Sequence, residues 1–198
     1  AAMDELSVLR QELMHICPGM ELRENEPMER HTTFRIGGPA RLMALPKSRE
    51  EAISAVRTAR ARGIAPFFLG NGSNLLVSDR GYPGFVVKLA GGLTSLSVEG
   101  NRMIAGSGVL LSALSRAALE HGLSGLEFSN GIPGSLGGAI TMNAGAYDGD
   151  MSMVVRSVDC LNEFGEVETL SGGELDFSYR HSAFSDGKRH ILGAELAL

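Results

Sequence analysis

Apolar residues recur at helical spacing in three parts of the chain. The second begins at Ser48 with Glu51 three residues later, a pattern typical of a capped helix start. The third ends at Gly122, which is suited to a helix C-cap because glycine tolerates a positive φ. The pattern therefore predicts helices over residues 4–16, from Ser48 to Gly63, and over 110–121.

Short apolar runs between glycine-rich or polar turns predict strands. Two pairs of runs are separated by tight turn sequences, Glu99–Asn101 and Asn162–Gly165, which indicates two β-hairpins. A strand, a helix and a strand follow one another over residues 40–69, which suggests a small βαβ unit. The expected strands cover residues 40–45, 65–69, 84–89, 96–98, 102–105, 154–161, 166–170 and 190–198.

These elements divide into two groups of different character. Residues 1–89 alternate helix and strand, whereas residues 90–198 contain antiparallel hairpins with one or two helices. A chain of 198 residues can form one large domain or two small ones. We therefore expect an α+β protein with a small α/β subdomain over 1–89 and a larger subdomain over 90–198.

Composition and charge narrow the function classes. The hydrophobic content of 43% is sufficient for a core, and a net charge of −5 without a Lys/Arg cluster argues against nucleic-acid or anionic-membrane partners. No apolar run approaches the roughly 20 residues that span a bilayer, and no signal-peptide pattern is present, so the cytoplasm is the expected compartment. Cys17 and Cys160 are isolated and the histidines are scattered, so neither a disulfide framework nor a metal site is indicated.

One stretch, residues 131–149, is unusually rich in glycine. It contains six glycines, together with the polar residues Thr141, Asn143 and Tyr147. Glycine permits close approach of the backbone to a ligand and permits positive φ. The stretch is interpreted as a backbone cradle for an oxyanion, for which a pyrophosphate fits best. The alternative is a tight loop packed under a sheet, and the number of glycines favours the cradle.

A second candidate loop, Gly70–Asn74, follows an expected strand. Its glycines do not complete a dinucleotide fingerprint, because the third glycine is missing and an apolar extended segment follows. The sequence also contains no P-loop motif. The loop presents Ser73, Asn74 and backbone N–H groups, so a phosphate loop and an ordinary Asn-Gly turn are equally good interpretations. Thr33 and Arg35 lie beside another glycine turn and could reach a ligand, although turn chemistry alone explains them.

Taken together, five motifs resemble the UDP-N-acetylenolpyruvoylglucosamine reductase (MurB) family of peptidoglycan synthesis. They occur in the family's order and cover nearly the whole chain from about residue 25. The resemblance implies an FAD-binding module of the vanillyl-alcohol oxidase and p-cresol methylhydroxylase type, in which FAD lies between two α+β subdomains. The motifs are Thr33–Gly38, Leu69–Asn74, Gly131–Gly138, Asn143–Tyr147 and Tyr179–Phe184.

The resemblance also implies site residues. Tyr147 lies near the substrate, and Arg180 is both a substrate-binding and a catalytic residue that stabilises an enolate-like intermediate and neighbouring anionic groups. Without the motif, Arg180 would be read as part of a surface ion pair. The implied cofactor-binding residues are Gly70, Asn71, Gly72, Ser73, Asn74, Gly131, Ile132, Pro133, Gly134, Gly138, Thr141, Gly145 and Ile191.

The implied reaction is NADPH-dependent, FAD-mediated reduction of UDP-N-acetylenolpyruvoylglucosamine to UDP-N-acetylmuramate. The family also has a substrate domain with a proton-donor Ser in a Gly-Ser-Xaa-Phe-Lys context and a catalytic Glu near its C-terminus, and neither motif occurs before Leu198. We therefore expect this chain to be the N-terminal FAD-binding portion of a longer reductase, inactive alone, with FAD and NADPH as cofactors and a UDP-sugar as substrate. The alternatives are another oxidoreductase with the same FAD module and a free-standing flavin module.

Overall fold

The computed structural model describes residues 4–31, 38–69, 82–89 and 91–198. The chain forms two compact units, Ala1–Gly92 and Leu93–Leu198. The boundary between the units lies after Gly92, whereas the sequence predicted it after residue 89.

Unit 1 contains a four-stranded mixed sheet in the order β1-β2-β4-β3. The strands β2 and β3 both run parallel to β4, which lies between them, whereas β1 is antiparallel to β2. The predicted strand-helix-strand unit is therefore a split one, because β4 follows β3 in sequence but separates it from β2 in the sheet. The elements are α1 (Glu5–Ile16), β1 (Glu21–Pro27), η1 (Met28–Arg30), β2 (Pro39–Leu45), α2 (Arg49–Ala61), β3 (Phe67–Leu69) and β4 (Tyr82–Lys88).

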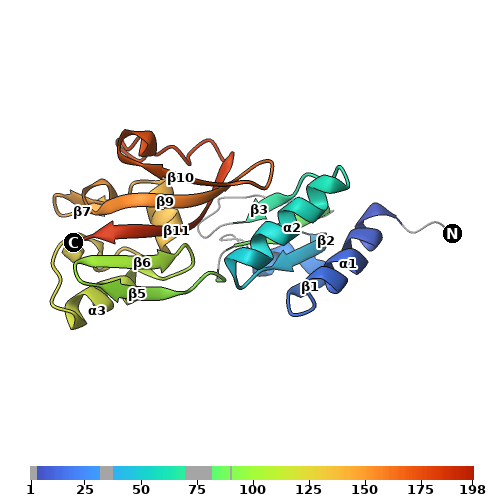
Figure 1. The fold of residues 1–198 in the computed structure, drawn as a ribbon, viewed down its shortest axis with the longest axis horizontal. Coiled ribbons are helices and arrows are strands. Elements are labelled where there is room, and N and C mark those ends of the chain that lie inside the picture. Colours follow the sequence, from blue (N-terminus) through green and yellow to red (C-terminus); the bar gives the residue numbers. More distant parts are fainter. Residues whose placement is uncertain (1–3, 32–37, 70–81, 90) are drawn as a thin grey trace. The chain divides into compact units, whose positions relative to one another are not determined.

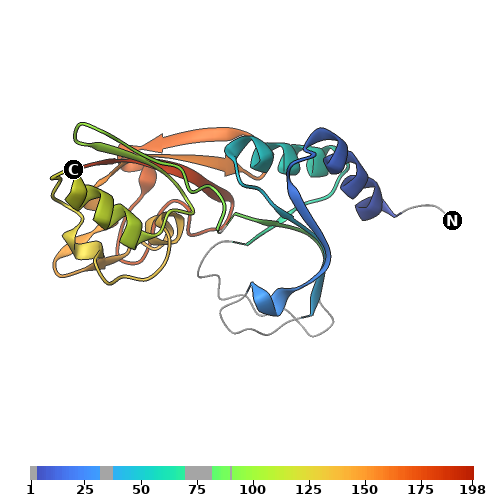
Figure 2. The same cartoon turned by 90° about the horizontal axis from the view of Figure 1, so that it is seen from below.

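Both α-helices of unit 1 begin at a side-chain cap. Asp4 accepts a hydrogen bond from the N–H of Ser7 at 2.9 Å, and Ser48 accepts one from the N–H of Glu51 at 3.1 Å. The Glu51 carboxylate reaches the N–H of Lys47 instead of that of Ser48, so the expected capping box is only half formed. The helices α1 and α2 pack against each other and against the sheet (Figure 2).

The sequence pattern did not predict β1. Its residues Glu-Leu-Arg-Glu-Asn-Glu-Pro show no apolar alternation, because β1 is the edge strand beside β2 and most of its side chains remain partly or fully exposed. Arg23 pairs with Glu21 and Glu26 along the strand, so ion pairs replace the apolar contacts of an inner strand. Of this strand only Glu26 is buried.

Unit 2 contains a five-stranded antiparallel sheet in the order β10-β9-β11-β6-β5 (Figure 1). Both predicted hairpins, the closing strand and the helix before Gly122 are confirmed. This helix ends in a Schellman motif: Leu123 N–H donates to Ala118 C=O, Gly122 N–H donates to Leu119 C=O, and Gly122 has φ +66°. The main elements are β5 (Leu96–Glu99), β6 (Arg102–Gly106), α3 (Leu111–Glu120), α4 (Leu136–Thr141), β9 (Val155–Asn162), β10 (Val167–Ser171) and β11 (Arg189–Ala197).

Shorter elements connect these. The two-residue strands β7 (Gly145–Ala146) and β8 (Gly149–Asp150) pair with each other. The remaining short helices are η2 (Glu127–Ser129), η3 (Met151–Met153) and η4 (Gly172–Leu175).

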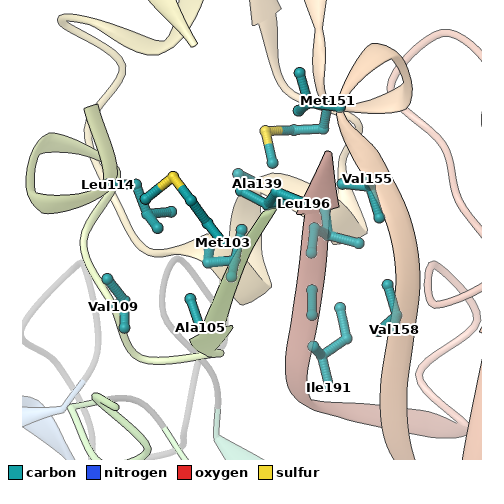
Figure 3. Packing of buried hydrophobic residues seen from close by; sticks show 14 of the residues in the cluster. Met103, Ala105, Val109, Leu114, Ala139, Met151, Val155, Val158, Ile191 and Leu196 are labelled. Atoms are coloured by element: carbon teal, nitrogen blue, oxygen red, sulfur yellow. The ribbon is translucent and has the colours of Figure 1, made fainter. Parts of the chain in front are cut away.

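The core of unit 2 lies between the sheet and the helices α3 and α4. Met103 and Ala105 from β6, Val158 from β9 and Leu196 from β11 point into it, as Figure 3 shows. Alternate residues of β6, such as Ile104, face away and are exposed. This packing fixes α4 and the glycine-rich residues before it on a rigid layer.

Among the described residues, no helix is both long enough and apolar enough to cross a membrane. The described residues also contain no group of three or more His, Cys, Asp and Glu side chains that could hold a metal ion.

Candidate functional site

The glycine-rich stretch lies alongside the segment that joins β6 to α3. Leu136 N–H bonds Val109 C=O at 2.8 Å, Leu111 N–H bonds Gly134 C=O at 3.0 Å, and Gly137 N–H bonds Ser107 C=O at 2.9 Å. The Cβ of any residue replacing Gly137 would be 3.1 Å from the Cβ of Ser107, so this glycine permits the close approach. Residues 134–137 are thus held as a rigid loop against Ser107–Leu111.

Several polar groups of this loop have no partner within the described residues. The N–H groups of Gly134, Ser135 and Gly138 donate no hydrogen bond there. Ser135 is the N-cap of α4 but does not cap it, whereas Asp4 and Ser48 do cap their helices. The hydroxyls of Ser135 and Ser107 likewise donate to no described residue; the two residues are 3% and 7% exposed, and because no buried side-chain oxygen of the described residues lacks a partner, these hydroxyls remain accessible to solvent. The loop therefore offers a set of backbone donors and two hydroxyls to an anion.

The glycines of the run serve different purposes. Gly131 and Gly134 have φ +92° and +109°, a backbone conformation that other residues rarely adopt, and the space around a Cβ at either position is open for 4 Å. At Gly145 a Cβ would lie 2.5 Å from Gly149 C=O, so pairing of β7 with β8 already explains that glycine. Gly131, Pro133 and Gly134 are exposed, and Ile132 is half-buried. The loop 131–134 therefore has its accessible side free for a ligand.

Replacing Gly134 with Val is expected to lower FAD affinity tenfold or more, which corresponds to about 1.4 kcal/mol, because the side chain strains the loop and enters the open space. Gly138→Val is expected to act in the same direction, because it adds bulk beside an open N–H. The matched control is Gly122→Val, which imposes left-handed strain at the end of α3 without touching the loop. Isothermal titration calorimetry with FAD measures the difference. Equal FAD affinity for Gly134→Val and the wild-type chain would show that Gly134 serves the turn alone.

The other predicted residues of the stretch occupy distinct environments. Thr141 is half-buried and its hydroxyl donates to Gly137 C=O at 2.8 Å, within its own helix. Tyr147 is 89% exposed with φ +52°, so its ring is available to a substrate. Ile191 is 6% exposed and belongs to the core cluster of unit 2 (Figure 3), so packing already accounts for it. The roles assigned to these residues at the site stay predictions.

Arg180 lies in a tight turn outside the sheet. The turn is closed by Ser178 N–H to His181 C=O at 3.1 Å and His181 N–H to Ser178 C=O at 3.2 Å. Arg180 is exposed, has φ +51°, and places its guanidinium 5.3 Å from the centre of the Tyr179 ring. A left-handed arginine is unusual, and such strain is concentrated at functional sites.

Sequence reasoning missed Ser107 and Ser135, which the structure brings together with the glycine loop. A signal for Ser107 was present in Gly106-Ser-Gly108, a second short glycine motif just before α3. Ser135 lay inside the glycine run but was not singled out. Both became candidates only when the pairing of residues 107–111 with 134–137 was known.

The loop Gly70–Asn74 and the residues Thr33 and Arg35 lie outside the described residues. Their predicted roles, including those of Asn71, Gly72 and Ser73 toward the cofactor, stay predictions.

Unit 1 contains a partly buried network of charged and polar side chains beside η1, in which the side chains of Glu26 and His31 are buried and those of Arg23 and Lys88 are partly exposed. The Glu26 carboxylate is 2.8 Å from His31 Nε2 and 2.8 Å from the Arg23 guanidinium, and Lys88 Nζ donates to His31 Nδ1 at 2.8 Å. Burial raises the pKa of Glu26, but the hydrogen bonds from His31 and Arg23 outweigh it and hold that pKa below its usual range. Burial, together with the nearby Arg23, lowers the pKa of Lys88. The His31 tautomer follows from these partners, with the proton on Nε2.

Covalent flavin attachment has no suitable thiol in unit 2. Cys160 is buried in β9, and burial raises its thiol pKa to about 11, so it is protonated and unreactive near neutral pH.

Comparison with known proteins identifies the class. The FAD binding domain family matches residues 40–171, and the chain belongs to that family. The UDP-N-acetylenolpyruvoylglucosamine reductase of Caldanaerobacter subterraneus subsp. tengcongensis is 47% identical over 191 residues, which are 96% of this chain and 63% of the relative. The crystal structure of that reductase (MurB) from Thermus caldophilus matches with TM-score 0.68 and 36% identity, covering 89% of this chain and 61% of the other. The resemblance inferred from the five motifs is thereby confirmed.

The fold class is confirmed as well. Alkyldihydroxyacetonephosphate synthase matches with TM-score 0.68 at 18% identity, covering 100% of this chain and 41% of the other, which shows the fold alone. The chain has the α+β FAD-binding fold of the vanillyl-alcohol oxidase and p-cresol methylhydroxylase type. It spans about three-fifths of the length of the reductases that it matches.

Proposed function

We propose that this chain is the FAD-binding part of an NADPH-dependent UDP-N-acetylenolpyruvoylglucosamine reductase that forms UDP-N-acetylmuramate for peptidoglycan synthesis. The observation that carries the proposal is the 47% identity to a protein of that name over 96% of the chain. Since both NADPH and a UDP-sugar are metabolites of the cell interior, we assign the reaction to the cytoplasm.

The residues of unit 2 fit a bound FAD. The N–H groups of Gly134, Ser135 and Gly138 donate to no described residue, and the loop 131–138 contains no Lys or Arg. Backbone donors of this kind suit a pyrophosphate, which FAD has and FMN lacks. We assign these N–H groups and the hydroxyls of Ser107 and Ser135 to the FAD pyrophosphate, with Gly70–Asn74 as a second loop. When bound, FAD supplies the redox chemistry, and the protein supplies orientation and electrostatics.

On the substrate side, the accessible groups are Arg180 and Tyr147. The Arg180 guanidinium carries a permanent positive charge and five N–H donors, so it can bind the anionic groups of a UDP-sugar and stabilise charge that develops on the enolpyruvyl group. The exposed Tyr147 ring offers an apolar face and a hydroxyl to the same ligand. The reaction also needs a proton donor, which we assign to the part of the relatives' length that this chain does not cover.

The proposal is tested by flavin binding. The purified chain is expected to show flavin absorbance bands that are released on denaturation, and calorimetry is expected to give tighter binding of FAD than of FMN. Release on denaturation is expected because neither a cysteine nor a histidine lies in either glycine loop. Equal affinity for FAD and FMN would remove the pyrophosphate argument, and absence of any flavin binding would overturn the proposal.

A further inference from the structure

The Asn143 side chain joins the glycine-rich stretch to the turn that carries Arg180. Asn143 is 8% exposed, and its Nδ2 donates to Ser178 C=O at 3.0 Å, while its Oδ1 accepts from Ser152 N–H at 3.0 Å. A backbone carbonyl can only accept and a backbone N–H can only donate, so these partners fix the orientation of the amide. A weaker contact of 3.4 Å leads from Nδ2 to the Asp150 carboxylate.

A second tether lies on the other side of the turn. Ser182 is 1% exposed, and its hydroxyl donates to Thr141 C=O at 2.8 Å. The Ser185 hydroxyl reaches the same carbonyl at 3.2 Å. The turn is therefore attached to residues 141–143 two residues before Arg180 and two residues after it.

The flanks of the turn are also held, by Ala183 N–H to Leu175 C=O at 2.8 Å and by the packing of Phe177 and Phe184 at the core, but the residues at its tip are not. Tyr179 is 85% exposed and Arg180 is exposed, so neither side chain is packed into the core. Ser178 C=O accepts from both His181 N–H and Asn143 Nδ2, so the bond that closes the turn and the bond that anchors it share one atom. Loss of Asn143 therefore acts directly on the backbone that holds Arg180 at φ +51°.

We propose that Asn143 and Ser182 are positioning residues that clamp the turn and set the place of the Arg180 guanidinium for the substrate. The proposal rests on the proposed function, in which Arg180 contacts the reacting group. Asn143 touches no substrate in this scheme and acts only through Arg180. Two buried side chains thus give an exposed arginine a defined position, which an isolated loop would not provide.

The test uses Asn143→Gly, because glycine accepts the φ of +45° at this position and only the side chain is lost. Asn143→Asp keeps an acceptor for Ser152 N–H but loses the donor to Ser178 C=O. Ser182→Ala removes the second tether. The matched control is Asn162→Ala, which deletes an amide that accepts from Phe164 and Glu166 N–H groups in the β9–β10 turn of the same unit.

Two measurements are made on flavin-loaded protein. Hydrogen exchange of the His181 amide, measured by NMR on residues 1–198, is expected to become at least tenfold faster in both Asn143 variants and unchanged in Asn162→Ala. In the full-length reductase, Asn143→Gly is expected to lower kcat by roughly 10- to 100-fold with FAD affinity within about twofold. Combined with Arg180→Ala, it is expected to add no further loss, because both changes remove the same interaction.

If the His181 amide exchanges at the wild-type rate in the Asn143 variants, the clamp is overturned. Faster exchange of this amide together with a wild-type kcat in the full-length reductase also overturns the proposal. A full-length wild-type protein without turnover overturns the proposed function instead, and the clamp is then judged on exchange alone.

Discussion

Arg180→Ala is expected to lower kcat by about 10² to 10³ in a protein that contains residues 1–198 together with the remaining length of the reductases, and to leave FAD affinity nearly unchanged. The guanidinium stabilises charge that appears on the substrate only as the reaction proceeds, so its loss acts on kcat more than on binding. Removal of one such donor from an active site is typically worth about 3–4 kcal/mol. The assay is NADPH oxidation that depends on the enolpyruvyl substrate.

Two further variants test whether the guanidinium geometry and the position of the arginine matter. Arg180→Lys keeps the charge but loses the planar fork, so its kcat should lie between those of the wild type and the alanine variant. Arg116→Ala removes an exposed arginine from α3 and should leave kcat unchanged.

Residues 1–198 alone should bind FAD but turn over near the detection limit, because loss of a general acid typically costs 10² to 10⁴ in rate and the rest of the substrate site is missing too. A wild-type kcat in Arg180→Ala would remove this residue from the mechanism, and substantial turnover by residues 1–198 would mean that the proton donor has been misplaced.

Local signals in the sequence predicted most elements of the fold. The hairpins β5–β6 and β9–β10 form around turns whose residues favour them, and α3 ends at Gly122 as glycine chemistry requires. The helix α4 was not predicted, because Gly137 and Gly138 disfavour helix and its first turn is instead held by Ser107 and Val109.

Elements that depend on distant partners could not be predicted from local patterns. The polar strand β1 exists because β2 offers it an edge, and the insertion of β4 between β2 and β3 follows from pairing across the sheet. For the same reason, the glycine cradle was visible as a composition, but the contribution of Ser107 was not. The Asn143 link to Ser178 joins residues that are 35 positions apart, and no short motif contains both.

The partly buried charges of unit 1 lead to the largest expected change in stability. His31→Ala is expected to lower the free energy of unfolding by about 1–3 kcal/mol. The substitution leaves Glu26, which is 6% exposed, with Arg23 as its remaining partner, and it leaves the Lys88 ammonium without an acceptor among the described residues. Lys88 is half-buried, so its ammonium keeps part of its hydration, and the main loss is that of the two hydrogen bonds that His31 makes.

The matching variant is Lys88→Met, which removes the ammonium and retains an apolar stem. It should cost about 1 kcal/mol or less, and it should restore part of the stability when added to His31→Ala, because the unpaired charge is then gone. The control Arg102→Ala breaks an exposed ion pair with Glu195 and should stay within about 1 kcal/mol of the wild type. Denaturant unfolding measures the totals, and hydrogen exchange in β1 and β4 reports unit 1 separately.

The pH dependence gives an independent check of the same network. Because the pKa of folded Glu26 lies below its usual range, its ionised form stabilises the folded state at neutral pH. That contribution is complete above the unfolded pKa and is lost as the pH falls through the folded pKa. His31→Ala removes the first of the two hydrogen bonds that lower this pKa, so the variant should lose less stability than the wild type between neutral and acidic pH. An equal loss in both proteins, or a double variant less stable than His31→Ala alone, would show that His31 does not link these charges.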